Sequence, residues 1–265
     1  MKQRIILLTG ASSGIGEEIA RQLVRRGDFP LLVARNAKKL MALKREFGQG
    51  DVFPCDVTSQ KAVNQVIHKA IARYGRVDVL INNAGFGHFG GALHTSMTDY
   101  ATMAETNYLG AVRLTKEILP HMLRQGSGRI INMASVAGLT GIPNLSAYCA
   151  SKFALIGFSE ALKLEFSPRI QVGVLCPGPV QSPFFRGEDP YRLFPELIAG
   201  QLLDVQTVAR HAVKLIDHPR VKVIPRGMSW AMRMRHLAPG IYLWAMKKLY
   251  DTYEKKQHTY QGHEA

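Results

Sequence analysis

The chain has 265 residues, 46% of them hydrophobic, which is enough for one sizeable core, and we expect a single domain over residues 1–265. Residues 228–265 would form a C-terminal extension with a polar tail. Three widely spaced cysteines, Cys55, Cys149 and Cys176, argue against a disulfide framework and a zinc site, and they fit a reducing, intracellular compartment. We therefore expect a cytoplasmic protein.

The formal charge is +14, from 34 Lys and Arg against 20 Asp and Glu. The basic residues cluster in 21–45 and again from 220 to the C-terminus. A nucleic-acid-binding surface would interleave basic groups with stacking aromatic residues, and the first cluster has almost none. We interpret that cluster as a solvated face and expect no nucleic-acid partner.

Residues 4–16, RIILLTGASSGIG, predict a strand, a glycine-rich loop and a helix that begins near Ile15. The apolar run 5–8 is continuous, which is typical of a strand buried on both faces in a parallel sheet. Gly10, Gly14 and Gly16 can bring bare backbone close to a ligand, and the helix N-terminus would then face a pyrophosphate. A tight turn is the alternative, because the spacing is G-x-x-x-G-x-G and not the common G-x-G-x-x-G.

The apolar run 29–34 predicts a second strand, which ends at Arg35. In dinucleotide folds an acidic residue near this position binds the ribose hydroxyls and would repel a 2′-phosphate. Because Arg35 stands there instead, the sequence favours NADP(H) over NAD(H). The alternative is a surface arginine at the end of a strand.

The third and fourth strands are predicted at 51–57 and 77–81, with a helix at 59–74 between them. Asp56 falls where the third strand would meet the rim of a cofactor site. The fourth strand runs into Asn82, Asn83, Ala84 and Gly85, where small residues would leave room for an adenosine, although a simple turn would look similar.

Apolar residues at helical spacing predict a long helix at 98–125, with a kink at Pro120. Asn107 lies in its first half. Asparagine is a poor helix-interior residue, so we expect its side chain to bind a specific partner. A fifth strand at 129–133 is followed by Ser135, at the strand end where ligands bind in open α/β sheets.

Tyr148 and Lys152 open a helix predicted to run to about residue 166, and four residues of separation place them on one face. A phenol has a pKa of about 10, which a neighbouring ammonium lowers. The pair is therefore a candidate acid/base device, although an isolated Tyr-x-x-x-Lys is frequent by chance.

Taken together, these motifs resemble the short-chain dehydrogenase/reductases in their compact single-domain form, over residues 2 to about 185. The matching residues are Thr9-Gly10-Ala11-Ser12-Ser13-Gly14-Ile15-Gly16, Asp56, Asn82-Asn83-Ala84-Gly85, Asn107, Ser135, Tyr148, Lys152 and Pro177-Gly178. Ser182 departs from the family pattern, because many relatives have threonine there. The expected fold is α/β, a doubly wound, seven-stranded and mostly parallel Rossmann-type sheet with an apolar helical extension at the C-terminus.

The resemblance also implies roles for four residues. Tyr148 would be the general acid in carbonyl reduction, and Ser135 would donate a hydrogen bond to the carbonyl oxygen. Lys152 would lower the Tyr148 pKa and hold the nicotinamide ribose, while Asn107 would anchor a water that joins Lys152 to solvent. No metal is required. The expected NADP(H) contacts are Gly10, Ser12, Ser13, Gly14, Ile15, Gly16, Arg35, Asp56, Val57, Asn83, Ala84, Gly85, Tyr148, Lys152, Pro177, Gly178, Val180 and Ser182.

The rest of the sheet is predicted from a sixth strand at 170–176, a helix at 205–216 and a seventh strand at 221–224. Between them, the segment up to about 200 contains five large apolar residues and is interpreted as a substrate lid, with ordinary packing as the alternative. Those residues are Phe184, Phe185, Tyr191, Leu193 and Phe194.

Residues 228–250 contain four methionines and both tryptophans. On a helical projection, residues 241–250 present an apolar arc of roughly 200°, with Trp244, Lys247 and Lys248 on the remainder. We expect the apolar face of this helix to be buried against another surface. That surface could belong to its own domain, a dimer partner, the substrate or a membrane. We expect this segment to set substrate preference and any peripheral membrane contact.

The leading hypothesis is an NADP(H)-dependent oxidoreductase that interconverts an apolar secondary alcohol, hydroxysteroid-like or lipid-like, and its carbonyl compound. A 3-oxoacyl-type reductase and a cofactor-binding regulatory protein without turnover are the alternatives, and a basic membrane- or nucleic-acid-binding module has only the charge in its favour. The resemblance further implies a homodimer or homotetramer in which the helices predicted at 98–125 and 148–166 pair with their symmetry mates.

Overall fold

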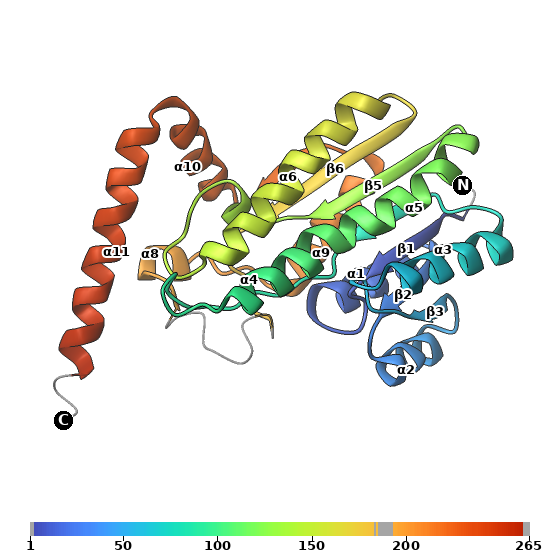
Figure 1. Cartoon of the computed structure of the whole chain (residues 1–265), viewed down its shortest axis with the longest axis horizontal. Helices are drawn as coiled ribbons and strands as arrows, with labels where there is room; N and C mark the ends of the chain where they lie inside the picture. Colours follow the sequence, from blue (N-terminus) through green and yellow to red (C-terminus); the bar gives the residue numbers. More distant parts are fainter. Residues whose placement is uncertain (1–2, 183, 185–192, 262–265) are drawn as a thin grey trace.

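The computed structural model describes residues 3–182, 184 and 193–261. Seven parallel strands form one sheet in the order β3-β2-β1-β4-β5-β6-β7, with helices on both faces (Figure 1). The strands are β1 (Ile5–Thr9), β2 (Phe29–Ala34), β3 (Asp51–Pro54), β4 (Val79–Asn82), β5 (Gly128–Met133), β6 (Ile170–Pro177) and β7 (Val221–Ile224). The predicted Rossmann-type fold is therefore confirmed.

The helices alternate with the strands along the chain and then end in a pair. They are α1 (Gly14–Arg25), α2 (Ala37–Phe47), α3 (Gln60–Tyr74), α4 (Met97–Ala104), α5 (Gly110–Arg124), α6 (Ser146–Phe166), α8 (Glu196–Ala199), α9 (Val205–Asp217), α10 (Arg226–Leu237) and α11 (Pro239–Gln261). Of the helices in the described ranges, none is both long enough and apolar enough to cross a membrane.

Strand β1 is buried on both faces, as its continuous apolar run predicts. Ile6 and Leu8 point into the core layer shared with α1, α2 and α9, and Leu7 points into the layer shared with α3, α5 and α6. All three side chains are fully buried. Because both layers are filled, ligand access is left to the edge where the strands end.

Most predicted elements agree with the structure to within two residues at each end, and two differ by more. Strand β3 ends at Pro54 and not at 57, because the Asp56 carboxylate accepts a hydrogen bond from the Thr58 amide at 3.0 Å and turns the chain. The helix predicted at 98–125 is divided into α4 and α5 by a π-helical turn, Glu105–Leu109. Asn107 lies in that turn, and its amide binds the backbone of Phe86.

The C-terminal extension is a pair of helices, α10 and α11, set against one end of the sheet and connected by a short turn at Ala238 (Figure 1). Met228 and Met232 of α10 are buried against Val136 and Val223. Helix α11 contributes Tyr242 to the same cluster. The extension is therefore packed onto the domain through one face of each helix.

A buried ladder of polar side chains connects β4 and β5 to α5 and α6. Asn82 donates through its side-chain amide to Asn132 at 2.8 Å and to Thr115 at 3.3 Å, and Asn132 donates in turn to Ser159 at 2.7 Å. A buried donor without its partner costs about 1–3 kcal/mol. The ladder therefore fixes the strand ends that carry the loops described below.

Replacing Asn132 with leucine, which is close in volume, should lower the free energy of unfolding by about 2–3 kcal/mol, because Asn82 and Ser159 each lose one hydrogen bond inside the core. Urea unfolding followed by circular dichroism measures this. The exposed Asn64→Leu on α3 serves as the matched control and should stay within about 0.5 kcal/mol of the parent. Equal effects of the two changes would show that the ladder does not stabilise the fold.

Candidate functional site

A cavity of about 1270 Å³ lies at the carboxyl ends of the strands. Its floor comes from the loops that follow β1, β2, β3, β4, β5 and β6, and one wall comes from α10 and α11. Every site residue predicted from the sequence lines this cavity, except Asn107. The volume exceeds the roughly 300–1,000 Å³ typical of a single drug-sized ligand, so it can hold a dinucleotide and a substrate together.

The glycine loop after β1 needs each of its glycines for a separate reason. Gly10 and Gly14 have φ angles of +66° and +55°, which side chains rarely adopt. A Cβ on Gly10 would also lie 2.9 Å from Cα of Ala84, and one on Gly16 would overlap the carbonyl oxygen of Gly10. The loop is a bare backbone cradle at the N-terminus of α1, which fits a pyrophosphate.

Thr9 holds the loops after β1 and β4 together, a role that the sequence did not reveal. Its buried hydroxyl accepts hydrogen bonds from the backbone amides of Asn83 and Ala84, both at 2.9 Å. The side-chain amide of Asn83 returns a hydrogen bond to the carbonyl of Thr9 at 3.1 Å. The only sequence signal was a hydroxyl residue at the end of a fully buried strand.

Arg35 and Asp56 lie at the rim where β2 and β3 end. Arg35 is exposed and lines the cavity. The backbone amide of Thr58 lowers the pKa of Asp56 below its ordinary range, with smaller contributions from the Thr58 hydroxyl and from the charge of Arg35. An arginine and an ionised carboxylate therefore flank this end of the cavity. Val57 forms the adjacent wall of the cavity, and Gly110 of α5 packs against Val57.

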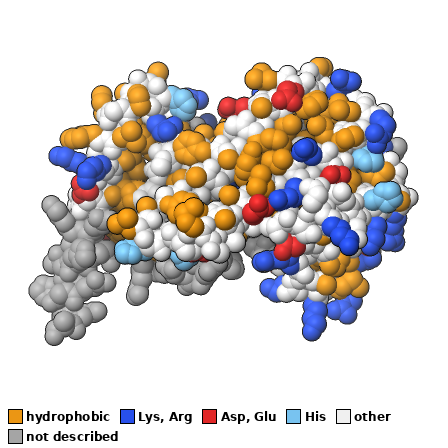
Figure 2. Space-filling model, in the orientation of Figure 1, with side chains coloured by type: hydrophobic (Ala, Val, Ile, Leu, Met, Phe, Trp, Pro, Cys, Tyr) orange, Lys and Arg blue, Asp and Glu red, His pale blue; other side chains and the backbone are white. Residues whose placement is uncertain are grey.

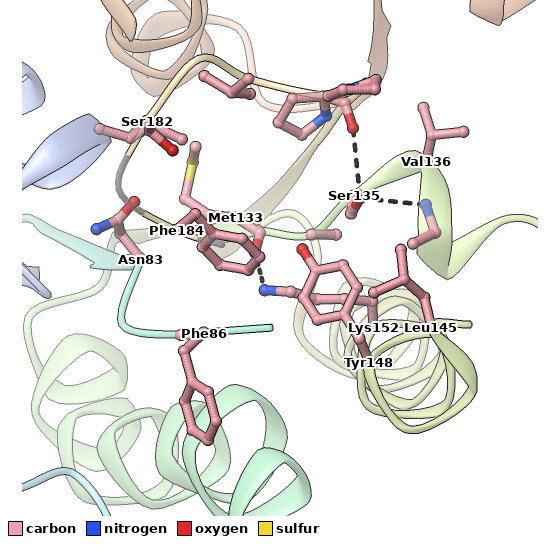
Figure 3. A pocket seen from close by; sticks show the side chains of 18 of the residues that line it. Asn83, Phe86, Met133, Ser135, Val136, Leu145, Tyr148, Lys152, Ser182 and Phe184 are labelled. Atoms are coloured by element: carbon pink, nitrogen blue, oxygen red, sulfur yellow. Dashed lines mark hydrogen bonds between the residues drawn. The ribbon is translucent and has the colours of Figure 1, made fainter. Parts of the chain in front are cut away.

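Tyr148 and Lys152 extend from α6 toward the same part of the cavity (Figure 3). They are only 7% and 4% exposed, and the Lys152 amine lies 5.7 Å from the centre of the Tyr148 ring. This amine donates a hydrogen bond to the carbonyl of Met133 at 2.8 Å. The helix thus delivers both groups to one place, as the spacing in the sequence predicts.

The pKa values of Tyr148 and Lys152 differ from the sequence prediction that Lys152 lowers the pKa of Tyr148. Burial raises the pKa of Tyr148, and the opposing contribution comes from Ser135 and not from Lys152. Burial also lowers the pKa of Lys152 to about 8. Lys152 therefore does not contribute the predicted lowering of the Tyr148 pKa, because desolvation dominates both groups.

Ser135 caps the short 3-10 turn Val136–Gly138 that follows β5. Its hydroxyl accepts a hydrogen bond from the Ala137 amide at 3.1 Å and donates one to the carbonyl of Pro177 at 3.4 Å (Figure 3). The long second bond is weak, so the hydroxyl proton can turn to another acceptor in the cavity. The cap fixes the position of the oxygen while leaving its donor available.

Asn107 is buried behind the cavity in the π-helical turn. Its side chain accepts from the Phe86 amide at 2.9 Å and donates to the Phe86 carbonyl at 2.9 Å and to Ser151 at 3.0 Å. A Cβ on Gly85 would lie 3.0 Å from the Asn107 oxygen and 3.5 Å from the Lys152 amine. Gly85 thus keeps open the space between these two groups, and the predicted water-anchoring role stays a prediction.

The turn after β6 completes the cofactor half of the cavity with Pro177, Gly178, Val180 and Ser182. A Cβ on Gly178 would meet the sulfur of Met228, so this turn packs directly on α10. The C-terminal extension therefore packs against the turn that lines this half of the cavity.

The other half of the cavity is apolar. Phe184 packs edge-on against Tyr148 with ring centres 5.3 Å apart. Further apolar lining includes Phe86, Ile142, Leu145, Phe194, Leu197, Ile198, Met228, Met232, Tyr242, Met246, Leu249 and Tyr250. Of the predicted lid, Phe185 and Tyr191 lie outside the described residues. The C-terminal segment, predicted to contact the substrate, contributes Met228, Met232 and Met246 to this apolar lining.

The model of the short chain dehydrogenase family matches residues 4–191. The chain belongs to the short-chain dehydrogenase family. Human dehydrogenase/reductase SDR family member 7 is 39% identical to this chain over 188 residues. The matched region covers 67% of this chain but only 56% of the human protein. The 3-ketodihydrosphingosine reductase of Bacteroides thetaiotaomicron is 40% identical over 229 residues, 83% of this chain and 81% of that protein.

A solved structure gives the same fold. The alcohol dehydrogenase of the archaeon Thermococcus sibiricus, complexed with 5-hydroxy-NADP, has a TM-score of 0.73 at 29% identity, covering 84% of this chain and 95% of its own. The family match ends at residue 191, so the wall formed by α10 and α11 lies beyond it.

The buried amine predicts a pH dependence of stability for this dehydrogenase. Because the pKa of Lys152 falls from 10.5 to about 8 on folding, the unfolded chain binds more protons between these values, and stability rises with pH across that window. Lys152→Met should abolish this rise, which amounts to roughly 3 kcal/mol for such a shift. Urea unfolding at several pH values between 7 and 10 measures it.

The exposed Lys163→Met on the same helix is the matched control and should leave the pH dependence unchanged. A parallel pH profile for the parent and Lys152→Met would show that the amine is not desolvated in the native state.

Proposed function

We propose that this dehydrogenase is an NADP(H)-dependent oxidoreductase that interconverts an apolar secondary alcohol, lipid-like or steroid-like, and its carbonyl compound. The observation that carries the proposal is the position of Tyr148. Tyr148 lines the same cavity as the glycine loop, packs against Phe184 of the apolar lining, and has Ser135 and Lys152 beside it.

The cradle after β1 fits a pyrophosphate, and the Lys152 amine, which lines the same cavity, would hold the ribose of a nicotinamide cofactor. Exposed Arg35 at the rim of β2 would pair with a 2′-phosphate, because a guanidinium binds phosphate oxygens in a bidentate manner. The solved relative complexed with 5-hydroxy-NADP supports this choice.

When bound, the reduced cofactor supplies a hydride to the carbonyl carbon. The chain's own residues then manage the charge on oxygen. The raised pKa keeps Tyr148 protonated at neutral pH, so its hydroxyl can deliver a proton to that oxygen. Ser135 would donate the second hydrogen bond. The Lys152 amine, 5.7 Å from the ring centre, would stabilise the phenolate that the transfer leaves.

The apolar half of the cavity supports a hydrophobic substrate. Adaptable side chains such as Met228, Met232 and Met246 fit irregular apolar surfaces. The similarity to a 3-ketodihydrosphingosine reductase also favours a carbonyl compound with a long apolar chain, and it keeps a 3-oxoacyl-type substrate within the class.

A cofactor-binding regulator without turnover is the second candidate. It is disfavoured because Asn107, Ser135, Tyr148 and Lys152 are all present and the last three line one cavity. Assembly as a homodimer or homotetramer through α5 and α6, a cytoplasmic location and a peripheral membrane contact through residues 228–265 also belong to this proposal.

Tyr148→Phe should abolish reduction of hydrophobic ketones while NADPH still binds, because it removes the proton donor and little volume. NADPH oxidation measured across a panel of ketones tests turnover, and fluorescence titration with NADPH tests binding. Tyr100→Phe, which removes a hydroxyl bonded to Ser146 at 2.5 Å, is a matched control outside the cavity. Substantial turnover by folded Tyr148→Phe would sink the mechanism.

Arg35→Asp should shift cofactor preference from NADPH toward NADH by about 2 kcal/mol or more, because it replaces a charge-assisted partner of the 2′-phosphate with a like charge. The ratio of kcat/KM for the two cofactors measures the shift. Arg45→Asp makes the same charge change on the exposed part of α2, outside the cavity, and controls for the change in net charge. Equal ratios for both variants would show that Arg35 does not contact the phosphate.

A further inference from the structure

The outer face of the helix pair α10–α11 exposes large apolar side chains. We call this the hairpin surface, and it consists of Trp230, Met234, Leu237, Ile241, Leu243 and Trp244, each between 44% and 78% exposed. Trp230, Met234 and Leu237 recur at helical spacing, so α10 presents them as one stripe opposite buried Met228 and Met232. Side chains of this kind exposed together mark an interaction surface.

Basic residues are interleaved with these apolar side chains, as the lobe formed by α10 and α11 shows (Figure 2). Lys248 lies 4.7 Å from the centre of the Trp244 ring, and Arg233 lies 6.0 Å from that of Trp230. Between residues 226 and 253 there is only one carboxylate, Asp251, and Lys247 binds it at 3.0 Å. The surface thus combines tryptophans with uncompensated positive charge.

The inner face of the same pair leads to the catalytic cavity. An apolar hollow of about 480 Å³ lies between α8 and α11 and includes Ala245 and Lys248. Four residues line both this hollow and the main cavity, namely Leu197, Tyr242, Met246 and Leu249. The hollow therefore adjoins the apolar half of the main cavity.

We propose that the hairpin surface docks on an anionic lipid membrane, and that the hollow between α8 and α11 admits the apolar chain of a membrane-borne carbonyl substrate. Tryptophan and basic residues on one helical face are the composition that binds at the headgroup level. The docking half gives the peripheral membrane contact of the proposed function a surface and a lipid class, and the substrate half rests on the apolar carbonyl substrate of the proposed function.

The positive charge of the hairpin surface favours binding to an anionic lipid surface over binding to a second copy of the chain. In a two-fold symmetric dimer the patch faces a second copy of the same patch, so the basic groups of one chain, among them Arg226, Arg233 and Lys248, would be brought close to those of the other. Anionic headgroups instead neutralise these groups while the apolar side chains enter the interface.

Sedimentation of the full-length protein with vesicles tests the docking. Vesicles of phosphatidylcholine containing phosphatidylserine should bind it, more weakly as salt rises, and phosphatidylcholine alone should bind much less. Met234→Glu should weaken binding to the anionic vesicles at least about fivefold, because it brings a negative charge to an anionic surface. Arg233→Ala should weaken it about fivefold.

Two changes on α2, far along the chain from the hairpin, are matched controls. Met41 is 46% exposed, against 44% for Met234, so Met41→Glu makes the same change at the same exposure. Arg45→Ala removes an exposed arginine from the same helix. Neither control should alter vesicle binding, and circular dichroism melting of each variant confirms folding.

The entry route is tested separately with Ala245→Phe, which fills the hollow without lining the main cavity. The ratio of kcat/KM for a long-chain ketone over a short soluble ketone should fall, and the equivalent change of exposed Ala42→Phe on α2 should leave it unaltered.

Absence of vesicle binding by the full-length protein, or equal binding by Met234→Glu and Met41→Glu, would overturn the docking surface. Self-association that Met234→Glu abolishes, without vesicle binding, would overturn it in favour of a dimer interface. An unchanged ratio in Ala245→Phe would overturn the entry route. Failure to reduce any carbonyl would count against the proposed function alone, because vesicle binding needs no turnover.

Discussion

The approach of three backbone segments at the ends of β1 and β4 is the constraint on which the site depends. The glycine loop, the start of α1 and the turn after β4 come so close that a Cβ on Gly10 or Gly16 would collide with backbone or with Asn83. Thr9 holds this arrangement with two hydrogen bonds to neighbouring amides. Because the glycines contribute no side chains, the same contact that closes the fold leaves bare amides facing the cavity.

The polar ladder and the Lys152 amine extend this constraint across the sheet. The ladder fixes the ends of β4 and β5 relative to α6, and Lys152 binds the carbonyl of Met133 at the end of β5. Tyr148, one helical turn earlier, is placed by the same anchor. The proposed acid/base pair is thus positioned by the core and not by the surrounding loops, which suits chemistry that depends on geometry.

The sequence predicted the strands well where burial on both faces leaves a continuous apolar run, as in β2, whose bounds agree with the prediction. It could not predict the π-helical turn, because the partners of Asn107 come from Phe86 and Ser151, distant along the chain. It also misjudged the Tyr148 pKa, since the spacing to Lys152 says nothing of how deeply both groups are buried. The apolar arc of 241–250 correctly indicated a packed helix, but Ile241 and Leu243, which lie at the two edges of that arc, are exposed.

The central claim is that one cavity holds a reduced nicotinamide beside an apolar carbonyl compound and transfers hydride between them. The most direct measurement uses NADPH deuterated at the transferable position of the nicotinamide C4, with a long-chain ketone as acceptor and mass spectrometry of the alcohol formed. The account predicts one deuterium on the carbinol carbon of the product. Tight NADPH binding with no labelled alcohol from any apolar ketone would contradict it and identify a cofactor-binding protein without turnover.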